Sequence, residues 1–274
     1  DECKLELTLT VGEVQGARVP MKKYLVNGVP RGQVDFVGNL RAVLFWPEHL
    51  ELVTDSPSLR RKYLDSVLVQ VDREYRRNLM SYERGLRQRN RLLDLINEGK
   101  AGRGQLLFWN QLLIKVGGYI TDKRAEYIDY INQCRMLNAE CQIEYDKSVI
   151  SEGRLEQYKD EEVGAKATLV GPHRDDFTIF KDEKELSKYG SRGEQRLAIL
   201  WLKLAELEFI TDRSREAGSG SARPILLLDD IFSELDEAHR KLVIDLIGRQ
   251  QTIITSADRD IIRIIPKTTQ QIIL

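Results

Sequence analysis

Two adjacent carboxylates, Asp229 and Asp230, follow a run of four apolar residues, 225–228. A continuous apolar run is typical of a buried parallel strand, and α/β proteins bind ligands at the carboxyl ends of such strands. Mg²⁺ prefers hard oxygen ligands and keeps several of its waters. The pattern therefore predicts that Asp229 holds Mg²⁺ through water and that Asp230 is the base that orients an attacking water. The alternative is an exposed strand end that carries two acids and no ligand.

A second candidate for phosphate chemistry is the segment 191–196, Ser-Arg-Gly-Glu-Gln-Arg, at the expected start of a helix. The first N–H groups of a helix and its dipole attract anions, and a glycine lets a phosphate approach closely. The alternative is a capping box, in which Ser191 and Glu194 satisfy the end of the helix. Taken alone, the segment favours the capping box.

The order of these segments along the chain resembles that of ABC-type ATPases. Residues 225–236 resemble a Walker B strand followed by a D-loop, with Ser233 and Asp236 at the D-loop positions. Residues 191–196, upstream of that strand, resemble the ABC signature. The resemblance implies that four residues contact the γ-phosphate of an ATP molecule held by the opposite subunit: Ser191, Arg192, Gly193 and Glu194.

Two longer segments narrow the resemblance to one family. Residues 45–65 contain a Pro-acid pair, an apolar run, a Ser-Pro turn and a double Arg, and residues 169–177 read Leu-Val-Gly-Pro-His-Arg-Asp-Asp-Phe. With the signature and Walker B in the expected order, they resemble the RecF family over nearly the whole chain. There are three departures: Asp55 replaces a usual Gly, Glu194 matches the SMC-type signature, and 255–258 lacks the His of many ABC ATPases.

The resemblance implies a role in recombinational DNA repair, replication-fork maintenance and the SOS response. ATP and Mg²⁺ would be the cofactors, and ATP would close a homodimer on double-stranded DNA or on junctions of single and double strands. RecR-type and RecO-type mediators would be partners in loading recombinase. An intact member of the family is expected to be a slow, DNA-dependent ATPase.

The phosphate-binding P-loop has no counterpart in these 274 residues. The nearest match to GxxxxGK[ST], Gly99-Lys100, fails because position 94 is Asp and Ala101 follows the lysine. The family carries this loop upstream of the position that matches Asp1, so we expect an N-terminal truncation and no ATP hydrolysis by this chain alone. Two other functions stay open: a DNA- or protein-binding scaffold with incidental nucleotide use, and an SMC-like structural ATPase head.

Hydrophobic periodicity predicts the elements that must position these residues. Strands are expected at 4–11, 23–26, 42–45, 167–170, 177–180, 225–228, 252–255 and 271–274. Helices are expected from about 58 to the glycine-rich break at 99–104, and at 105–140, 194–212 and 237–249. The first two helices are expected to pair as an antiparallel arm.

The predicted fold class is α/β: an ABC-type ATPase lobe with a mixed sheet and helices, plus a mostly helical arm, lobe II. Residues 1–45 are assigned to a β-rich remnant of ATPase lobe I. Residues 46–212 are assigned to the helical lobe II, which ends in the signature helix. Residues 213–274 are assigned to the C-terminal part of lobe I, with Walker B and the D-loop.

Local charge points to nucleic acid, although the net charge is only −1. Ten Lys or Arg stand against four acids between Arg60 and Arg91. Five arginines fall at helical spacings and are predicted to line one edge of the first long helix as a phosphate rail: Arg73, Arg77, Arg84, Arg87 and Arg91. The alternative is an ordinary solvated face.

Several classes of protein are disfavoured by composition. The three cysteines form no CxxC pair, and Cys134 and Cys141, expected on one helical face, lack a further zinc ligand nearby. Apolar runs are much shorter than the ~20 residues of a membrane span, and no signal-peptide pattern is present. The sequence therefore predicts a cytoplasmic protein with no membrane partner.

Overall fold

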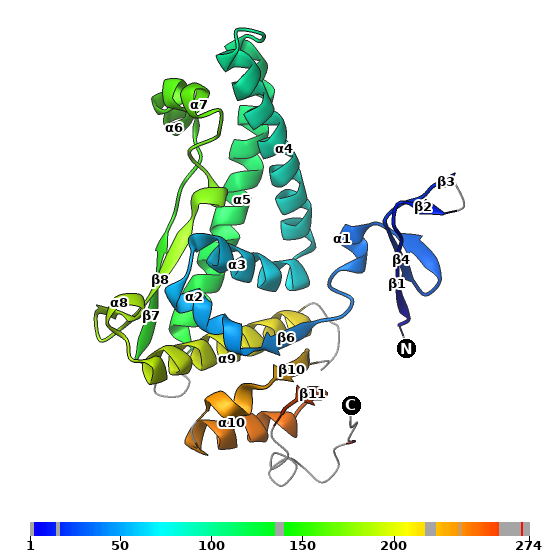
Figure 1. The fold of residues 1–274 in the computed structure, drawn as a ribbon, viewed down its shortest axis with the longest axis vertical. Coiled ribbons are helices and arrows are strands. Elements are labelled where there is room, and N and C mark those ends of the chain that lie inside the picture. The colour runs from blue at the N-terminus through cyan, green and yellow to red at the C-terminus, as the bar shows by residue number, and fades with distance from the viewer. Residues whose placement is uncertain are drawn as a thin grey trace.

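The structure is a computed structural model that describes residues 3–14, 17–134, 140–216, 223–235, 237–257 and 270. A helical arm rises from one side of a body that contains a parallel sheet, and a small antiparallel sheet lies to the side of the body (Figure 1). This arrangement confirms the predicted α/β class with a mostly helical arm. The predicted strand at 271–274 lies outside the described residues.

The arm is built on α3 (Pro57–Val71), α4 (Arg73–Asn97) and α5 (Leu106–Gln133), and the 3-10 turn η2 (Arg103–Gln105) leads into α5. The prediction of one helix from 58 onward was wrong at Asp72. The Asp72 side chain accepts a hydrogen bond from Tyr75 N and caps a new helix there.

The two long helices of the arm pack closely along their length. Gly85 of α4 faces α5, where an added Cβ would lie 3.1 Å from Leu113 Cδ2. This close approach explains why the sequence places a glycine in the middle of a long helix, at a cost of about 1 kcal/mol in helix propensity.

A second layer of the arm contains β7 (Cys141–Asp146), antiparallel to β8 (Asp176–Lys181). The predicted helix at 105–140 was wrong at its end, because α5 stops at Gln133 and β7 follows. The missed signal was a period of two: Cys141, Ile143 and Tyr145 are less exposed than the residues between them.

The segment 167–170, predicted as a strand, is irregular. Its backbone is held by side chains instead of a neighbouring strand: Thr168 N donates to Asn90 Oδ1 at 2.8 Å and Leu169 N donates to Glu162 Oε1 at 2.9 Å. Two short helices, α6 (Glu152–Gln157) and α7 (Lys159–Ala165), precede it, and η3 (Pro172–Arg174) follows it.

The body contains a parallel sheet in the order β11-β10-β6. It consists of β6 (Ala42–Phe45), β10 (Ile225–Asp229) and β11 (Thr252–Thr255), and Leu226 pairs with both Val43 and Thr252. The strand order brings the first 45 residues against the last 50, so the sheet forms only when both ends of the chain meet. The predictions for β6, β10 and β11 are confirmed.

Helix α9 (Arg192–Glu216) lies between the arm and the sheet (Figure 1). It is buried on most of its surface and carries Trp201 in the centre of the core. Two short segments connect β6 to α3: η1 (Pro47–Leu50) and α2 (Glu51–Thr54). Strand β9 (Lys184–Glu185) and helix α8 (Leu186–Tyr189) lead from β8 into α9.

The remaining elements lie at the two ends of the chain. The N-terminal sheet has the order β1-β4-β5, from β1 (Leu5–Leu9), β4 (Lys22–Val26) and β5 (Val29–Arg31), with a small hairpin of β2 (Glu13–Val14) and β3 (Ala17–Arg18). Helix α1 (Gln33–Phe36) follows this sheet in the chain and packs against the start of α4, which we call the foot of the arm. After β10 come η4 (Ile231–Glu234) and α10 (Glu237–Ile247).

Candidate functional site

Asp229 ends β10 at the carboxyl edge of the parallel sheet, and its carboxylate is exposed. The Thr255 hydroxyl, at the end of neighbouring β11, donates a hydrogen bond to Asp229 Oδ1. The Thr255 carbonyl accepts a hydrogen bond from Asp230 N at 3.1 Å. One residue therefore contacts both acids. Sequence reasoning did not assign Thr255 to the site, although a polar residue at the end of the strand next to the two acids was the available signal.

Asp230 has a left-handed backbone conformation, with φ 47° and ψ 28°. Non-glycine residues adopt this region rarely, Asp more readily than most, and such residues concentrate at functional sites. Directly after it, Ser233 lies in η4, while Asp236 is outside the described residues. The sharp turn places Asp230 beyond the strand end, next to Asp229.

The two carboxylates fit a magnesium site of a particular kind. Within the described ranges, no group of three or more His, Cys, Asp or Glu side chains is placed to hold a metal ion. Mg²⁺ is commonly bound by one or two carboxylates, with waters and substrate phosphates as the other ligands. The donor set at Asp229 and Asp230 matches that chemistry, in which the nucleotide completes the coordination.

The two cysteines considered above for zinc do not share a helical face. Cys134 follows the last turn of α5, whereas Cys141 begins β7. Burial raises the pKa of each thiol to about 11. Both side chains pack against the hydrophobic core, so they behave as small apolar groups.

The signature segment forms the capping box that its sequence allowed. Ser191 Oγ accepts a hydrogen bond from Glu194 N at 3.3 Å, and Glu194 Oε2 accepts hydrogen bonds from Ser191 N at 2.9 Å and Ser191 Oγ at 2.8 Å. Lys181 of β8 also contacts Glu194, at 3.1 Å. These bonds, the one from the Ser191 backbone first, lower the pKa of Glu194 to about 2. Ser191 and Glu194 thus fix the start of α9.

Gly193, in the first turn of α9, has no structural need to be glycine. An added Cβ would meet no atom within 4 Å, and its φ is not positive. Glycine is less favourable than alanine in a helix by up to about 1 kcal/mol. Ser191, Arg192 and Gly193 are all exposed. The N–H groups of Ser191 and Glu194 are bonded within the capping box, so Arg192 and Gly193 between them form the part of the helix start that another group can approach closely.

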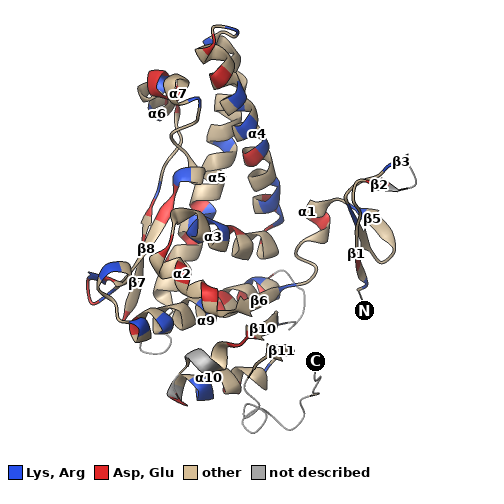
Figure 2. Ribbon diagram, viewed as in Figure 1, with Lys and Arg blue, Asp and Glu red and all other residues tan. Residues whose placement is uncertain are grey.

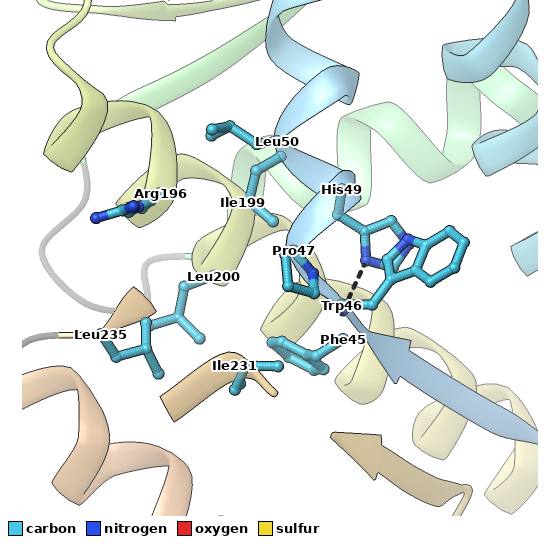
Figure 3. Close-up of a pocket in the computed structure, with 10 residues that line it drawn as sticks. All are labelled: Phe45, Trp46, Pro47, His49, Leu50, Arg196, Ile199, Leu200, Ile231 and Leu235. Carbon is cyan, nitrogen blue, oxygen red and sulfur yellow. Dashed lines mark hydrogen bonds between the residues drawn. The ribbon is translucent and has the colours of Figure 1, made fainter. Parts of the chain in front are cut away.

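An apolar pocket lies between the first turns of α9 and the sheet edge (Figure 3). Arg196 and Ile199 of α9 are on one side, and Ile231 and Leu235, just after the two acids, are on another. Residues after β6 close the pocket, where Trp46 N donates a hydrogen bond to His49 Nδ1 at 3.3 Å. The first turns of α9 and the segment after Asp229 and Asp230 thus face a common pocket.

The five arginines predicted as a phosphate rail all lie on α4 and are exposed. Figure 2 shows basic positions at intervals along this helix. Successive helical residues turn by about 100°, so these side chains fall within an arc of about 80°. We call Arg73, Arg77, Arg84, Arg87 and Arg91 the arginine stripe. Arg89, on the inner side of the same helix, is buried and bonds to Glu162 at 2.6 Å. The structure thus separates the exposed arginines of α4 from a structural one.

The two segments that carry the family resemblance bind each other. Arg60 donates to both carboxylate oxygens of Asp176, at 2.6 and 2.9 Å, and Arg61 donates to Asp175 O at 2.8 Å. Asp55, at a position where the family usually has glycine, has φ −103° and accepts a hydrogen bond from Arg60 Nη1 through its carbonyl. The turn there does not need glycine.

A buried polar network holds the middle of the arm. Arg124 of α5 donates to Asp65 at 2.8 Å, to Asp175 at 3.0 Å and to Pro172 O at 2.7 Å. Asp175 also accepts hydrogen bonds from Tyr145 and from Ser148 N. The turn at 171–176 is therefore braced by hydrogen bonds. Arg124 was missed, because an arginine inside a helical pattern carries no sign of burial.

No helix among the described residues is long and apolar enough to cross a membrane.

A comparison with models of protein families found no match. Curated relatives named DNA replication and repair protein RecF include one from Herpetosiphon aurantiacus, 39% identical over 257 residues, which covers 87% of this chain and 65% of the relative. Another, from Halothermothrix orenii, is 38% identical over 280 residues and covers 93% and 72%. The chain thus spans about two thirds of the length of these relatives.

Two solved structures are also similar, each with a TM-score of 0.81 and 29% identity. They are described as the recombination mediator protein RecF in the RecFOR pathway, one with ATP and the other with ATPrS. Each alignment covers 94% of this chain, and 71% or 72% of the solved chain. At this identity and coverage the likeness extends over the arm and the body together.

Proposed function

The chain belongs to the RecF family of DNA replication and repair proteins, and from this premise we propose that it acts in DNA repair as an ATP-dependent, DNA-binding protein of the cytoplasm. One observation carries the nucleotide part of the proposal. Asp229 and Asp230 lie at the carboxyl edge of the parallel sheet, while Gly193, which the packing does not require, is exposed at the start of α9.

The proposed roles follow from this geometry. Asp229, whose carboxylate accepts a hydrogen bond from Thr255, would hold Mg²⁺ through water, and Asp230 would orient the attacking water. The start of α9, from Ser191 to Glu194, receives the γ-phosphate of a nucleotide bound to a second subunit, with the helix N–H groups as donors. Ser233 and Asp236 belong to the D-loop at the same interface.

ATP binding and dimerisation are then linked. A nucleotide that contacts two subunits stabilises the dimer, and by reciprocity the dimer tightens nucleotide binding. Hydrolysis removes the γ-phosphate contact to the start of α9, so that the dimer opens. In this proposal the closed dimer holds double-stranded DNA or a junction of single and double strands, and RecR-type and RecO-type mediators use it to load recombinase.

Substitution of Asp230 tests the nucleotide part. In a form of the protein that also carries the phosphate-binding P-loop, Asp230→Asn is expected to slow ATP turnover about 10²- to 10⁴-fold, because the general base is lost. The ATP-bound dimer is expected to accumulate in size-exclusion chromatography with light scattering. Asp245→Asn, an exposed acid of α10, is the control. Unchanged turnover in Asp230→Asn refutes its role as base.

The arginine stripe is the proposed DNA surface. About four phosphate contacts give a slope near −3 to −4 in a plot of log affinity against log salt. Fluorescence anisotropy with a labelled duplex measures this slope. Arg84→Gln and Arg91→Gln are each expected to reduce it by about one, whereas Arg154→Gln, on exposed α6, leaves it unchanged. A slope near zero for the unmodified chain contradicts the DNA surface.

A scaffold that binds DNA or protein, with incidental nucleotide use, is the second candidate. The buried network around Arg124 favours it, because a rigid arm holds a binding surface in place without nucleotide. Titration with a fluorescent ATP analogue separates the two. Intact DNA binding with affinity independent of nucleotide supports the scaffold. DNA binding that tightens with ATP supports the ATP-dependent function.

A further inference from the structure

The foot of the arginine stripe is occupied by an acid of the protein itself. Arg73 donates to Asp35 Oδ1 through Nε at 2.9 Å and also through Nη2. Asp35 belongs to α1, the short helix that packs against both β4 of the N-terminal sheet and α4. In Figure 2 the acidic position of α1 lies across from basic positions at the foot of α4. A carboxylate thus sits where the stripe is expected to hold a phosphate.

Two further arginines act on the same carboxylate. The hydrogen bond from Arg73 lowers the pKa of Asp35, and the positive charges of Arg77 and Arg31 lower it further. Arg31 ends β5 and lies opposite Tyr24, whose ring packs 5.1 Å from the ring of Phe36 in α1. The cations therefore come from both the arm and the N-terminal sheet.

The position of α1 is fixed by contacts that do not involve the Asp35 carboxylate. The Asn39 side chain donates to Asp35 O at 2.7 Å and to Phe36 O at 2.8 Å. Gly38, with φ +91°, lies so close to the foot of the arm that an added Cβ would be 3.0 Å from Gln70 O. The backbone of α1 can therefore stay in place while the Asp35 side chain turns away.

The ion pair is exposed and easily exchanged. The side chains of Arg73 and Asp35 are 55% and 41% exposed. Exposed pairs contribute little to stability, and guanidinium groups bind phosphate at least as readily as carboxylate. A phosphate that replaces Asp35 would keep the hydrogen bonds of Arg73 and add the release of counterions from DNA.

We propose that Arg31, Arg73 and Arg77 form a seat for a DNA backbone phosphate that Asp35 fills in the absence of DNA. This inference rests on the proposed DNA-binding function of the arginine stripe. It extends the DNA surface from α4 across α1 to the N-terminal sheet and makes Asp35 an internal competitor that weakens DNA binding. The seat recognises phosphate and not bases, so it adds affinity without sequence preference.

Substitution of Asp35 in the 274-residue chain tests the phosphate seat. Asp35→Asn is expected to tighten binding to a labelled duplex about fivefold to tenfold near 0.1 M salt, and to steepen the log–log salt slope by about one. Asp160→Asn is the control, since Asp160 forms another solvent-exposed pair, with Arg103, elsewhere on the arm. It changes net charge by the same amount and is expected to alter affinity by less than about twofold.

Arg31→Gln is the second variant in the test. In the Asp35→Asn background it is expected to remove most of the gain in affinity and in slope. Equal affinities and slopes for Asp35→Asn and Asp160→Asn overturn the seat, while the DNA surface stands if Arg84→Gln still weakens binding. If none of Arg84→Gln, Arg31→Gln and Asp35→Asn changes duplex binding, both the phosphate seat and the proposed DNA surface are overturned.

Free phosphate is the other possible occupant. At constant ionic strength, replacing chloride by inorganic phosphate is expected to leave duplex binding by the unmodified chain unchanged. If phosphate weakens duplex binding relative to chloride, and Arg31→Gln removes this difference, the seat binds a small anion and its assignment to DNA is overturned.

Discussion

In the interior of the arm, several charged side chains are buried and bonded to one another. Arg89 and Arg124 are only 2% and 3% exposed, and Asp175 is fully buried. At the edge of the parallel sheet the reverse holds, since Asp229 is exposed and its described hydrogen-bond partner is the neutral hydroxyl of Thr255. Buried ion pairs hold a shape, whereas exposed acids at a strand end remain able to bind a metal or phosphate.

The signature segment lies between these extremes. Ser191 and Glu194 bond to each other as the arm residues do, yet the neighbouring Arg192 and Gly193 are exposed like the acids of the sheet edge. A capping box and a phosphate site are therefore compatible here, because the side chains of Ser191 and Glu194 cap the helix while Arg192 and Gly193 between them stay exposed.

Removing one partner of the buried network is the strongest way to break this comparison. Arg124→Met is expected to destabilise the protein by about 3–5 kcal/mol, because Asp65 and Asp175 lose their positive partner and Asp175 is left charged inside the arm. Urea unfolding measures the loss.

The matched control for that change is Arg103→Met, which breaks an exposed pair of the same arm. Its expected cost is much smaller than that of Arg124→Met, because both side chains are solvated. Equal losses in the two variants would show that burial does not distinguish the ion pairs of the arm.

Lowering the pH tests a buried titratable group of the arm, His173. His173 Nε2 donates to Thr168 O at 2.9 Å, which leaves Nδ1 to accept from Tyr82 OH at 2.7 Å, and burial lowers the pKa of His173 from 6.5 to about 4. Between these values the unfolded chain binds a proton that the folded chain does not. Stability is therefore expected to fall as the pH drops from 6.5 to 4, by up to about 3 kcal/mol from this group.

The difference between the unmodified chain and His173→Gln isolates this contribution from that of the carboxylates. Urea midpoints at several pH values measure it, and an NMR titration of the imidazole is expected to have its midpoint near pH 4. Parallel pH profiles for the two proteins contradict the assignment to His173.

The smallest expected effect concerns Gly193. Gly193→Ala is expected to raise stability by up to about 1 kcal/mol, because the helix gains alanine and the Cβ meets no atom. The same change is expected to weaken ATP-dependent dimerisation, measured by light scattering in a form that also carries the phosphate-binding P-loop. Gly164→Ala, in α7 with equally open space, should give the gain in stability alone. A dimer unaffected by Gly193→Ala would leave this glycine without a nucleotide role.

The sequence by itself determined the features that depend on local pattern. A continuous apolar run placed β10 and the two acids after it, and helical spacing placed the arginine stripe on an exposed face of α4. The order of the motifs along the chain is sufficient to indicate the family. Each of these signals lies within a few residues of chain, where periodicity and capping act directly.

Only the tertiary structure decided which of the charged residues are structural. Arg124 and Arg84 look alike in sequence, yet one lies among Asp65, Asp175 and Pro172 O from distant segments and the other faces outward. The pairing of β7 with β8 and the contact of Asp35 with Arg73, 38 residues away, depend in the same way on the packed chain. Burial and long-range contact set the role of a charge, because they decide whether its partner is the protein or a ligand.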